Sequence, residues 1–451
     1  MRKWQYPLCL GLALLLAIQL SACATEPPPA STPEEPGPTP TLTLEQLYQQ
    51  YLDQGDVYLE QELWDEAIDE YNKAVELNHE RANTYAKRAI AYNGKDGFYE
   101  LAILDCEKAL ELDPLVKLDS SLAHVYIRRG EYNAQFIRGL TYDTSSKSYE
   151  DDKKDFEKSV ADFTRAIELD PRLAEAYKGR ADSYVDFYNE RWRYNEITAD
   201  YDQAIADYNM AIALNPTNAA YYASRAWAYD LGGNYDRKMA DITRAIELDP
   251  TNAAYYSSRG HTYLDGWDNY EKAIADFTRS IELDPDNEWG YSSRADAYMG
   301  KKDYDSAIDD YTKAVGLSTG WLVSSLYNDR GWAYIAKKEY DAAIADFTKA
   351  IELDEFSSSK YFNDRASAYL EQENYDLAIA DSSKAIELYS EYDDAYWVRG
   401  QAYATTGEKD KALADFRDCL SLTEDFEEKY FAETKERNKM VRQWIEELES
   451  D

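Results

Sequence analysis

A unit of about 34 residues recurs along this chain of 451 residues, and no other feature constrains its fold as strongly. One copy, Ala253–Asn287, reads AAYYSSRGHTYLDGWDNYEKAIADFTRSIELDPDN, and the six residues TNAAYY occur at both Thr217–Tyr222 and Thr251–Tyr256. The first half of that copy predicts an amphipathic helix, Gly266–Asn269 a turn, and the second half another helix that ends before Pro285. Such a period indicates a stack of helix pairs, not separate globular domains.

The unit resembles the tetratricopeptide repeat in the residue types at its fixed positions. That family places Gly or Ala at position 8, Tyr at 11, Ala at 20, Phe or Tyr at 24, Ala at 27 and Pro at 32. With one extra residue allowed in the turn, those positions hold Gly260, Tyr263, Ala273, Phe277, Ser280 and Pro285. The small residues let two antiparallel helices approach closely, and the aromatic residues fill the space between repeats.

Ten such units follow one another between residues 47 and 424. Position 8 is occupied in turn by Gly55, Ala89, Gly139, Ala181, Ala226, Gly260, Ala295, Gly331, Ala366 and Gly400. The resemblance implies an all-α fold, an α-solenoid with a right-handed superhelix of about ten helix–turn–helix units. Residues 425–451 predict a charged amphipathic helix that caps the open end. The segment Leu115–Glu131 fits the repeat least, and either extends the first helix of repeat three or forms an extra helix.

The first 46 residues are of a different kind. Arg2 and Lys3 precede an apolar run, Leu8–Leu20, that is too short for a membrane-spanning helix. The run ends in Leu-Ser-Ala-Cys, which resembles the lipobox of bacterial lipoproteins and implies that residues 1–22 are a signal peptide and Cys23 is lipidated. An ordinary secretory signal with an accidental cysteine is the alternative. Residues 23–46, rich in proline, predict a semi-extended tether, so we expect the repeats outside the cytoplasm, anchored to a bacterial membrane.

Opposite charges recur at two positions of the repeats. Repeats two to ten carry arginine at position 7, where repeat one has Gln54, and every second helix carries an acid at position 23. Because the arginine is missing only where no repeat precedes it, we expect the acid of one repeat to pair with the arginine of the next. The expected pairs include Glu70 with Arg88, Asp276 with Arg294, Asp310 with Arg330 and Asp346 with Arg365, and Arg138 would serve repeat three. Such partly exposed pairs set register more than they add stability.

The resemblance also implies a binding groove. In tetratricopeptide proteins the first helices line a concave groove, mainly through positions 2, 5, 9 and 12. Those positions offer Trp227, Asp230, His261, Trp289, Asp296, Trp332 and Trp397, and the Lys/Asn clamp of chaperone-binding members is lacking. Exposed tryptophans in an acidic groove suit a basic or apolar peptide. Each tryptophan fits packing between repeats equally well.

A second candidate is the basic and aromatic insertion of repeat four, which contains Arg191, Trp192, Arg193 and Tyr194. Insertions in repeat proteins lie on one face and often bind partners. A helix extension that packs on its neighbour accounts for the same residues.

Charge and residue types exclude several classes of function. Without Arg2 and Lys3 the chain has 47 basic and 87 acidic side chains, and such a surface repels nucleic acid. The three histidines, His79, His124 and His261, have no metal-ligand spacing, and no phosphate-binding loop, nucleophile elbow or HExxH motif occurs. We therefore expect no metal, no cofactor and no enzymatic activity.

Recognition of another protein remains. We expect a non-catalytic, membrane-anchored scaffold or adaptor that assembles proteins of the bacterial cell envelope by binding an extended or helical peptide. Binding of cell-wall or extracellular glycan is the alternative, because aromatic platforms beside hydrogen-bonding side chains also suit sugars.

Overall fold

The structure is a computed structural model, and it describes residues 42–116, 122–137, 149–190, 201–320, 322–354, 358–423 and 432–450. The expected signal peptide, Cys23 and the tether as far as residue 41 lie outside these residues, as does the insertion at 191–194.

All the secondary structure of the described residues is helical, and the helices follow one another in pairs. They are α1 (Leu44–Glu60), α2 (Trp64–Leu77), α3 (Ala82–Gly94), α4 (Tyr99–Leu112), α5 (Leu122–Ile137), α6 (Tyr149–Leu169), α7 (Ala174–Glu190), α8 (Asp202–Leu214), α9 (Ala219–Leu231), α10 (Tyr235–Leu248), α11 (Ala253–Trp267), α12 (Tyr270–Leu283), α13 (Glu288–Lys301), α14 (Tyr304–Leu317), α15 (Leu322–Ala336), α16 (Tyr340–Leu353), α17 (Ser358–Glu371), α18 (Tyr375–Leu388), α19 (Asp393–Thr405), α20 (Lys409–Thr423) and α21 (Ala432–Ser450).

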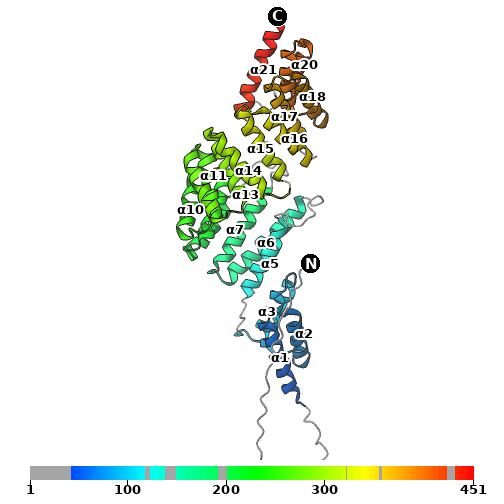
Figure 1. The fold of residues 1–451 in the computed structure, drawn as a ribbon. Coiled ribbons are helices and arrows are strands. Elements are labelled where there is room, and N and C mark those ends of the chain that lie inside the picture. Colours follow the sequence, from blue (N-terminus) through cyan, green and yellow to red (C-terminus); the bar gives the residue numbers. More distant parts are fainter. Residues whose placement is uncertain are drawn as a thin grey trace, which may run out of the picture.

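Each odd-numbered helix up to α19 packs on the even-numbered helix that follows it, and each pair packs on the next. The pairs form an elongated stack with α1 near one end and α21 at the other (Figure 1). The expected all-α solenoid of about ten helix pairs with a further helix at the C-terminal end is thus confirmed.

The sixth pair shows how local sequence sets the ends of the helices. The side chain of Asn252 accepts a hydrogen bond from the Ala254 N–H at the start of α11, and Asn269 does the same for Lys272 in α12. Between the two helices, Asp268 takes a left-handed backbone conformation with φ 48°. The turn is therefore shorter than the predicted Gly266–Asn269, because α11 continues to Trp267.

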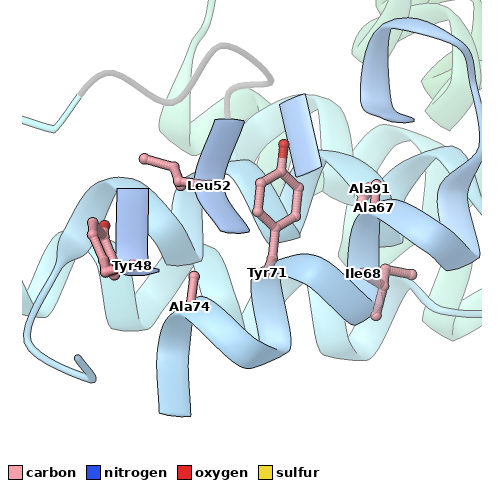
Figure 2. Packing of buried hydrophobic residues seen from close by; sticks show 7 residues of the cluster. All are labelled: Tyr48, Leu52, Ala67, Ile68, Tyr71, Ala74 and Ala91. Carbon is pink, nitrogen blue, oxygen red and sulfur yellow. The ribbon is translucent and has the colours of Figure 1, made fainter. Parts of the chain in front are cut away.

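Close approach of the paired helices depends on the small residues of the repeat. A Cβ atom added to Gly260 on α11 would lie 2.7 Å from Cε1 of Phe277 on α12, so only glycine fits against that buried ring. Figure 2 shows the corresponding core of the first pair, where the ring of Tyr71 lies among small and aliphatic side chains of three helices. That cluster consists of Tyr48, Leu52, Ala67, Ile68, Tyr71, Ala74 and Ala91.

The ion pairs close within a repeat, which corrects the expected pairing between neighbours. Arg294 donates two hydrogen bonds, of 2.7 and 2.8 Å, to Asp310 of its own helix pair, and Asp276 is likewise held by Arg259. The same bidentate pair joins Arg88 to Asp105, Arg330 to Asp346 and Arg365 to Asp381. Glu70 of repeat one instead pairs with Lys73, one turn away on α2. The reason is geometric: positions 7 and 23 face each other across one antiparallel helix pair.

The arginine does contact the preceding repeat, but through a neutral group. The remaining nitrogen, Nη1, of Arg294 donates to the Thr278 hydroxyl at 3.0 Å, and Arg365 donates to Thr348 in the same way. Each guanidinium also lies over a tyrosine or phenylalanine ring, with Arg294 5.9 Å from the centre of Tyr291. One side chain therefore fixes its own helix pair and the register of the pair before it.

The register of repeat three differs from the prediction. Arg129 on α5 pairs with an acid of α6, through bonds of 3.0 and 2.6 Å to Asp162, whereas Arg138, the arginine expected at position 7, lies outside the described residues. Gly130 lies against the ring of Phe163, so it takes position 8 in place of Gly139. The segment Leu115–Glu131 thus provides most of the first helix of this repeat, and residues 138–148 lie outside the described chain.

Helix α21 covers the last repeat. Val441 is fully buried against α20, and the ring of Trp444 lies 6.0 Å from that of Phe416. Arg437 pairs with Asp393 and Asp394 at the start of α19. In the described part of the chain, every helix is too short or too polar to cross a bilayer.

Candidate functional site

Four of the seven expected groove residues lie around one hollow. Trp227 and Asp230 of α9, His261 of α11 and Trp289 of α13 line a cavity of about 790 Å³. The two tryptophans are 50% and 51% exposed, so about half of each large aromatic side chain is accessible to a ligand. We call this hollow, with these four residues, the Trp227–Trp289 groove.

An ion pair with a buried lysine lines the Trp227–Trp289 groove. Lys238, which replaces the small residue usual at position 20, is only 4% exposed, and its ammonium lies 2.8 Å from Asp230. A buried lysine needs such a partner, because an unpaired charge away from water is costly. Asp265 and Asp284 also line the cavity, so its ionised groups are mainly acidic.

His261 is held in one orientation. Its Nδ1 lies 2.9 Å from the Ser257 carbonyl oxygen, which can only accept, so Nδ1 carries the proton in the neutral ring. Nε2 is 3.1 Å from the Ser293 hydroxyl of the next repeat, and the ring meets the edge of Phe277 at 4.9 Å. The imidazole therefore forms part of a fixed groove wall.

The groove continues toward the N-terminal end past Trp227. The same tryptophan lines a second hollow of about 450 Å³ with Lys178, Tyr208 and Tyr255, so one continuous surface runs from α7 to α13. The Tyr208 hydroxyl donates to Asp182 at 2.7 Å and keeps that carboxylate at the edge of the hollow.

Trp332 and Trp397 are separated from the Trp227–Trp289 groove. They line another cavity, of about 870 Å³, which lies between α15, α17, α19 and α21 and is called here the C-terminal hollow. Trp332 meets Phe347 edge-on at 6.0 Å, and Trp397 lies 5.6 Å from Phe416. The single groove expected from positions 2, 5, 9 and 12 is thus two sites.

Asp296, the remaining groove residue, lines neither cavity. The Tyr311 hydroxyl donates a hydrogen bond of 2.5 Å to its carboxylate, as Tyr71 does to Asp56 at 2.8 Å. In repeats six and eight position 24 holds phenylalanine, and position 9 holds His261 or Trp332 instead of an acid. A tyrosine at position 24 is thus paired with an aspartate at position 9, because a buried hydroxyl needs an acceptor.

Residues that the sequence reasoning missed lie in and beside the C-terminal hollow. Asn363 and Asp364 of α17 are each 4% exposed and line it. Burial raises the pKa of Asp364 to about 6, and burial also raises that of Asp329 on α15 to about 6. The tripeptide Asn-Asp-Arg, which occurs at 328–330 and again at 363–365, is the sequence signal that could have found them.

Other expected features can be placed only in part. Cys23 and the residues Arg191, Trp192, Arg193 and Tyr194 lie outside the described chain. Within it, Cys106 and Cys419 are buried free thiols whose pKa burial raises to about 12, and no cluster of side chains suitable for a metal ion is found in the described ranges.

Comparison with known proteins identifies the repeat along most of the chain. Family models of the tetratricopeptide repeat match residues 55–96, 141–173, 198–253, 253–287, 290–319, 324–357 and 363–423. Sperm-associated antigen 1 of Rattus norvegicus and of Mus musculus are 37% and 34% identical over 90 residues. That alignment spans 19% of this chain and a tenth of the length of those relatives.

Solved structures with similar folds include yeast Tom70 and YrrB. Tom70 matches 90% of this chain and 96% of its own, at 18% identity and a TM-score of 0.43. YrrB, a TPR protein with an unusual peptide-binding site, matches 41% of this chain and 93% of its own, at 22% identity and a TM-score of 0.33.

Proposed function

Because the chain is built of tetratricopeptide repeats, we propose that it is a non-catalytic scaffold that binds a segment of a partner protein in the Trp227–Trp289 groove. The observation that carries the proposal is that two half-exposed tryptophans and several acidic groups line the same cavity. Rigid aromatic rings give much contact area for little loss of conformational entropy, and they are enriched where binding energy concentrates.

The character of the partner segment follows from the charges of the groove. Asp230 is neutralised by Lys238, which leaves Asp265 and Asp284 available to attract a cation. A segment that alternates apolar and basic side chains would place its apolar groups on the two indoles and its cations beside the carboxylates or over a ring face. An acidic segment would be repelled by the same carboxylates.

The proposal includes the site of action in the cell. A lipid on Cys23 would hold the protein at a bacterial membrane, outside the cytoplasm, and the proline-rich residues that follow would keep the repeats at a distance from it. The scaffold would then assemble proteins of the cell envelope. Replacement of Cys23 by serine should abolish incorporation of radiolabelled palmitate and release the protein from membranes.

The decisive experiment is affinity purification of the tagged full-length protein from crosslinked cell envelopes. A Trp227→Ala/Trp289→Ala variant should lose a stoichiometric protein partner that the parent protein retains. Trp267→Ala is the matched control, because that tryptophan is 43% exposed but does not line the groove. Retention of the partner by the double variant would remove the groove from the proposal, and co-purification of wall polymer alone would replace the scaffold by glycan binding.

A further inference from the structure

The C-terminal hollow has features that packing of repeats does not require. It lies between first helices of the last three repeats on one side and α21 on the other, with Arg437 and Met440 contributed by α21. Its aromatic walls are Trp332, Tyr392 and Trp397. It shares no lining residue with the Trp227–Trp289 groove, so a ligand here would bind independently.

Two buried acceptors in the C-terminal hollow have no donor. Oδ2 of Asp364 and Oδ1 of Asn363 make no hydrogen bond within the described chain, and Oδ1 of Asn328, beside them on α15, makes none either. A buried polar group without a partner costs about 1–3 kcal/mol, and a charged one more, so native proteins seldom keep several together. Three in one place indicate a donor that binds there.

One oxygen of the Asp364 carboxylate, Oδ2, is covered from solvent and makes no hydrogen bond. A guanidinium group pairs best with both oxygens of a carboxylate, so a carboxylate with one covered oxygen does not favour arginine. A primary ammonium can pair with a single oxygen.

Charge indicates a cation as the donor. Besides Asp364, the acids Glu371, Asp394 and Glu436 line the hollow, and its one base, Arg437, is engaged by Asp393 and Asp394. Indole and phenol faces attract cations, and Trp332 is still 38% exposed. A quaternary ammonium would suit the rings but has no N–H for the oxygens, whereas a primary ammonium carries three.

We propose that the C-terminal hollow binds the primary ammonium of a lysine side chain, with the carboxylate of the buried Asp364 as its counter-ion and Trp332 and Trp397 beside the cation. The inference rests on the proposed function only in that a protein partner carries the lysine. It adds a second contact to that partner, chemically different from the apolar contact in the Trp227–Trp289 groove.

Lysine binding should be linked to protonation of Asp364. Burial raises the pKa of that carboxyl to about 6, while the nearby Lys360 ammonium and the hydrogen bonds from Trp332 and Asn328 lower it and Asp394 raises it. A bound ammonium favours the ionised form, so affinity should be highest above pH 6 and fall as Asp364 is protonated below it. Arg437 keeps its charge throughout this range.

Calorimetric titration of the full-length protein with Nα-acetyl-lysine N-methylamide tests the proposal. The neutral norleucine analogue and the Nε-trimethyl analogue should each bind at least about tenfold more weakly, since the first lacks the charge and the second lacks the N–H donors. Equal affinity for the trimethyl analogue would overturn the assignment to a primary ammonium. Equal affinity for n-butylamine would assign the hollow to small amines and overturn the lysine assignment.

Asp364→Asn is the decisive variant and Glu371→Gln its matched control, because both remove one acid from the same hollow but Glu371 is exposed. Asp364→Asn should weaken binding of the lysine probe at least about tenfold without lowering the melting temperature, and Glu371→Gln should stay within about threefold. Unchanged affinity in Asp364→Asn would overturn the inference. The Trp227→Ala/Trp289→Ala variant should bind the probe normally, so failure of the groove and failure of this site are distinguishable.

Discussion

Tyr311 and Phe347 both occupy position 24, in successive repeats, and differ by one hydroxyl group. That hydroxyl group determines which kind of side chain faces them from position 9. Tyr311 is 3% exposed and donates to the solvent-facing Asp296, whereas Phe347 has no polar group and meets the indole of Trp332. The contact between positions 9 and 24 is thus a hydrogen bond in one repeat and a contact between two rings in the next.

Replacing Tyr311 by phenylalanine should lower the free energy of unfolding by about 1–3 kcal/mol, because the buried hydrogen bond to a carboxylate is lost. The double variant Tyr311→Phe/Asp296→His recreates the pairing of Phe277 with His261 and should recover part of that loss. Urea denaturation of the parent and both variants measures the effect. A double variant no more stable than the single one would show that the two positions are not coupled.

At the scale of the element, the arginine at position 7 holds the two helices of its own pair together. Its guanidinium spans three segments: the aspartate of its own second helix, a hydroxyl or amide of the preceding second helix, and an aromatic ring of its own first helix. The side chains of Arg294 and Asp310 are 18% and 10% exposed. A pair this well covered is costly to break from one side only.

A double-mutant cycle separates the two possible pairings. Arg294→Met and Asp310→Leu should each destabilise the protein by about 2–4 kcal/mol, with a coupling energy above 1 kcal/mol between them. The matched cycle of Arg294→Met with Asp276→Leu should give coupling near zero, since Asp276 is paired with Arg259. Larger coupling in the second cycle would contradict the pairing within a repeat.

Sequence reasoning succeeded where the repeat itself carried the information. The period, the small residues at Gly260 and Ala273 and the proline after α12 all follow from local patterns, and they sufficed for the fold. The partner of Asp276 could not be predicted in this way. Arg259 and Arg294 are 17 and 18 residues from it, and only the way the helices pack decides between them.

The register of repeat three and the grouping of the groove residues could not be predicted from the sequence, for related reasons. Arg-Gly occurs at 129–130 and at 138–139, and both fit positions 7 and 8, so an insertion makes the register ambiguous. The groove residues were assigned by position alone. Their division into two cavities depends on which repeat partners cover which side chain, and on α21, whose Arg437 reaches back to α19.

At the scale of the whole molecule, the acidic side chains do not all affect stability in the same way. The net charge is −38, but most surface acids are solvated or lie one turn from a lysine or arginine, as in Arg279 with Glu282. Asp329 and Asp364 are different, because burial penalises their ionised forms. They make the C-terminal repeats the part of the stack most responsive to acid.

Stability should therefore increase as pH falls from 7 to about 4.5. The pKa of each of these two carboxyls is about 6 in the folded protein and about 3.9 when unfolded, so the folded state binds more protons between those values. The gain from both should be about 3–4 kcal/mol, measured by urea denaturation across the range. An Asp329→Asn/Asp364→Asn variant should be more stable at pH 7 and lose this part of the pH dependence, and an unchanged slope would contradict the assignment.

The closure of each buried arginine–aspartate pair within its own helix pair makes the repeat a module suited to duplication and loss. Excision of residues 251–285 would remove Arg259 together with Asp276, so neither half of that buried pair would be left without its partner. Arg294 would then meet Thr243 where it now meets Thr278, the same residue type one repeat earlier. An array of this kind can change its length by recombination in whole repeats while each intermediate still folds, and the duplicated TNAAYY segments are what such a history would leave.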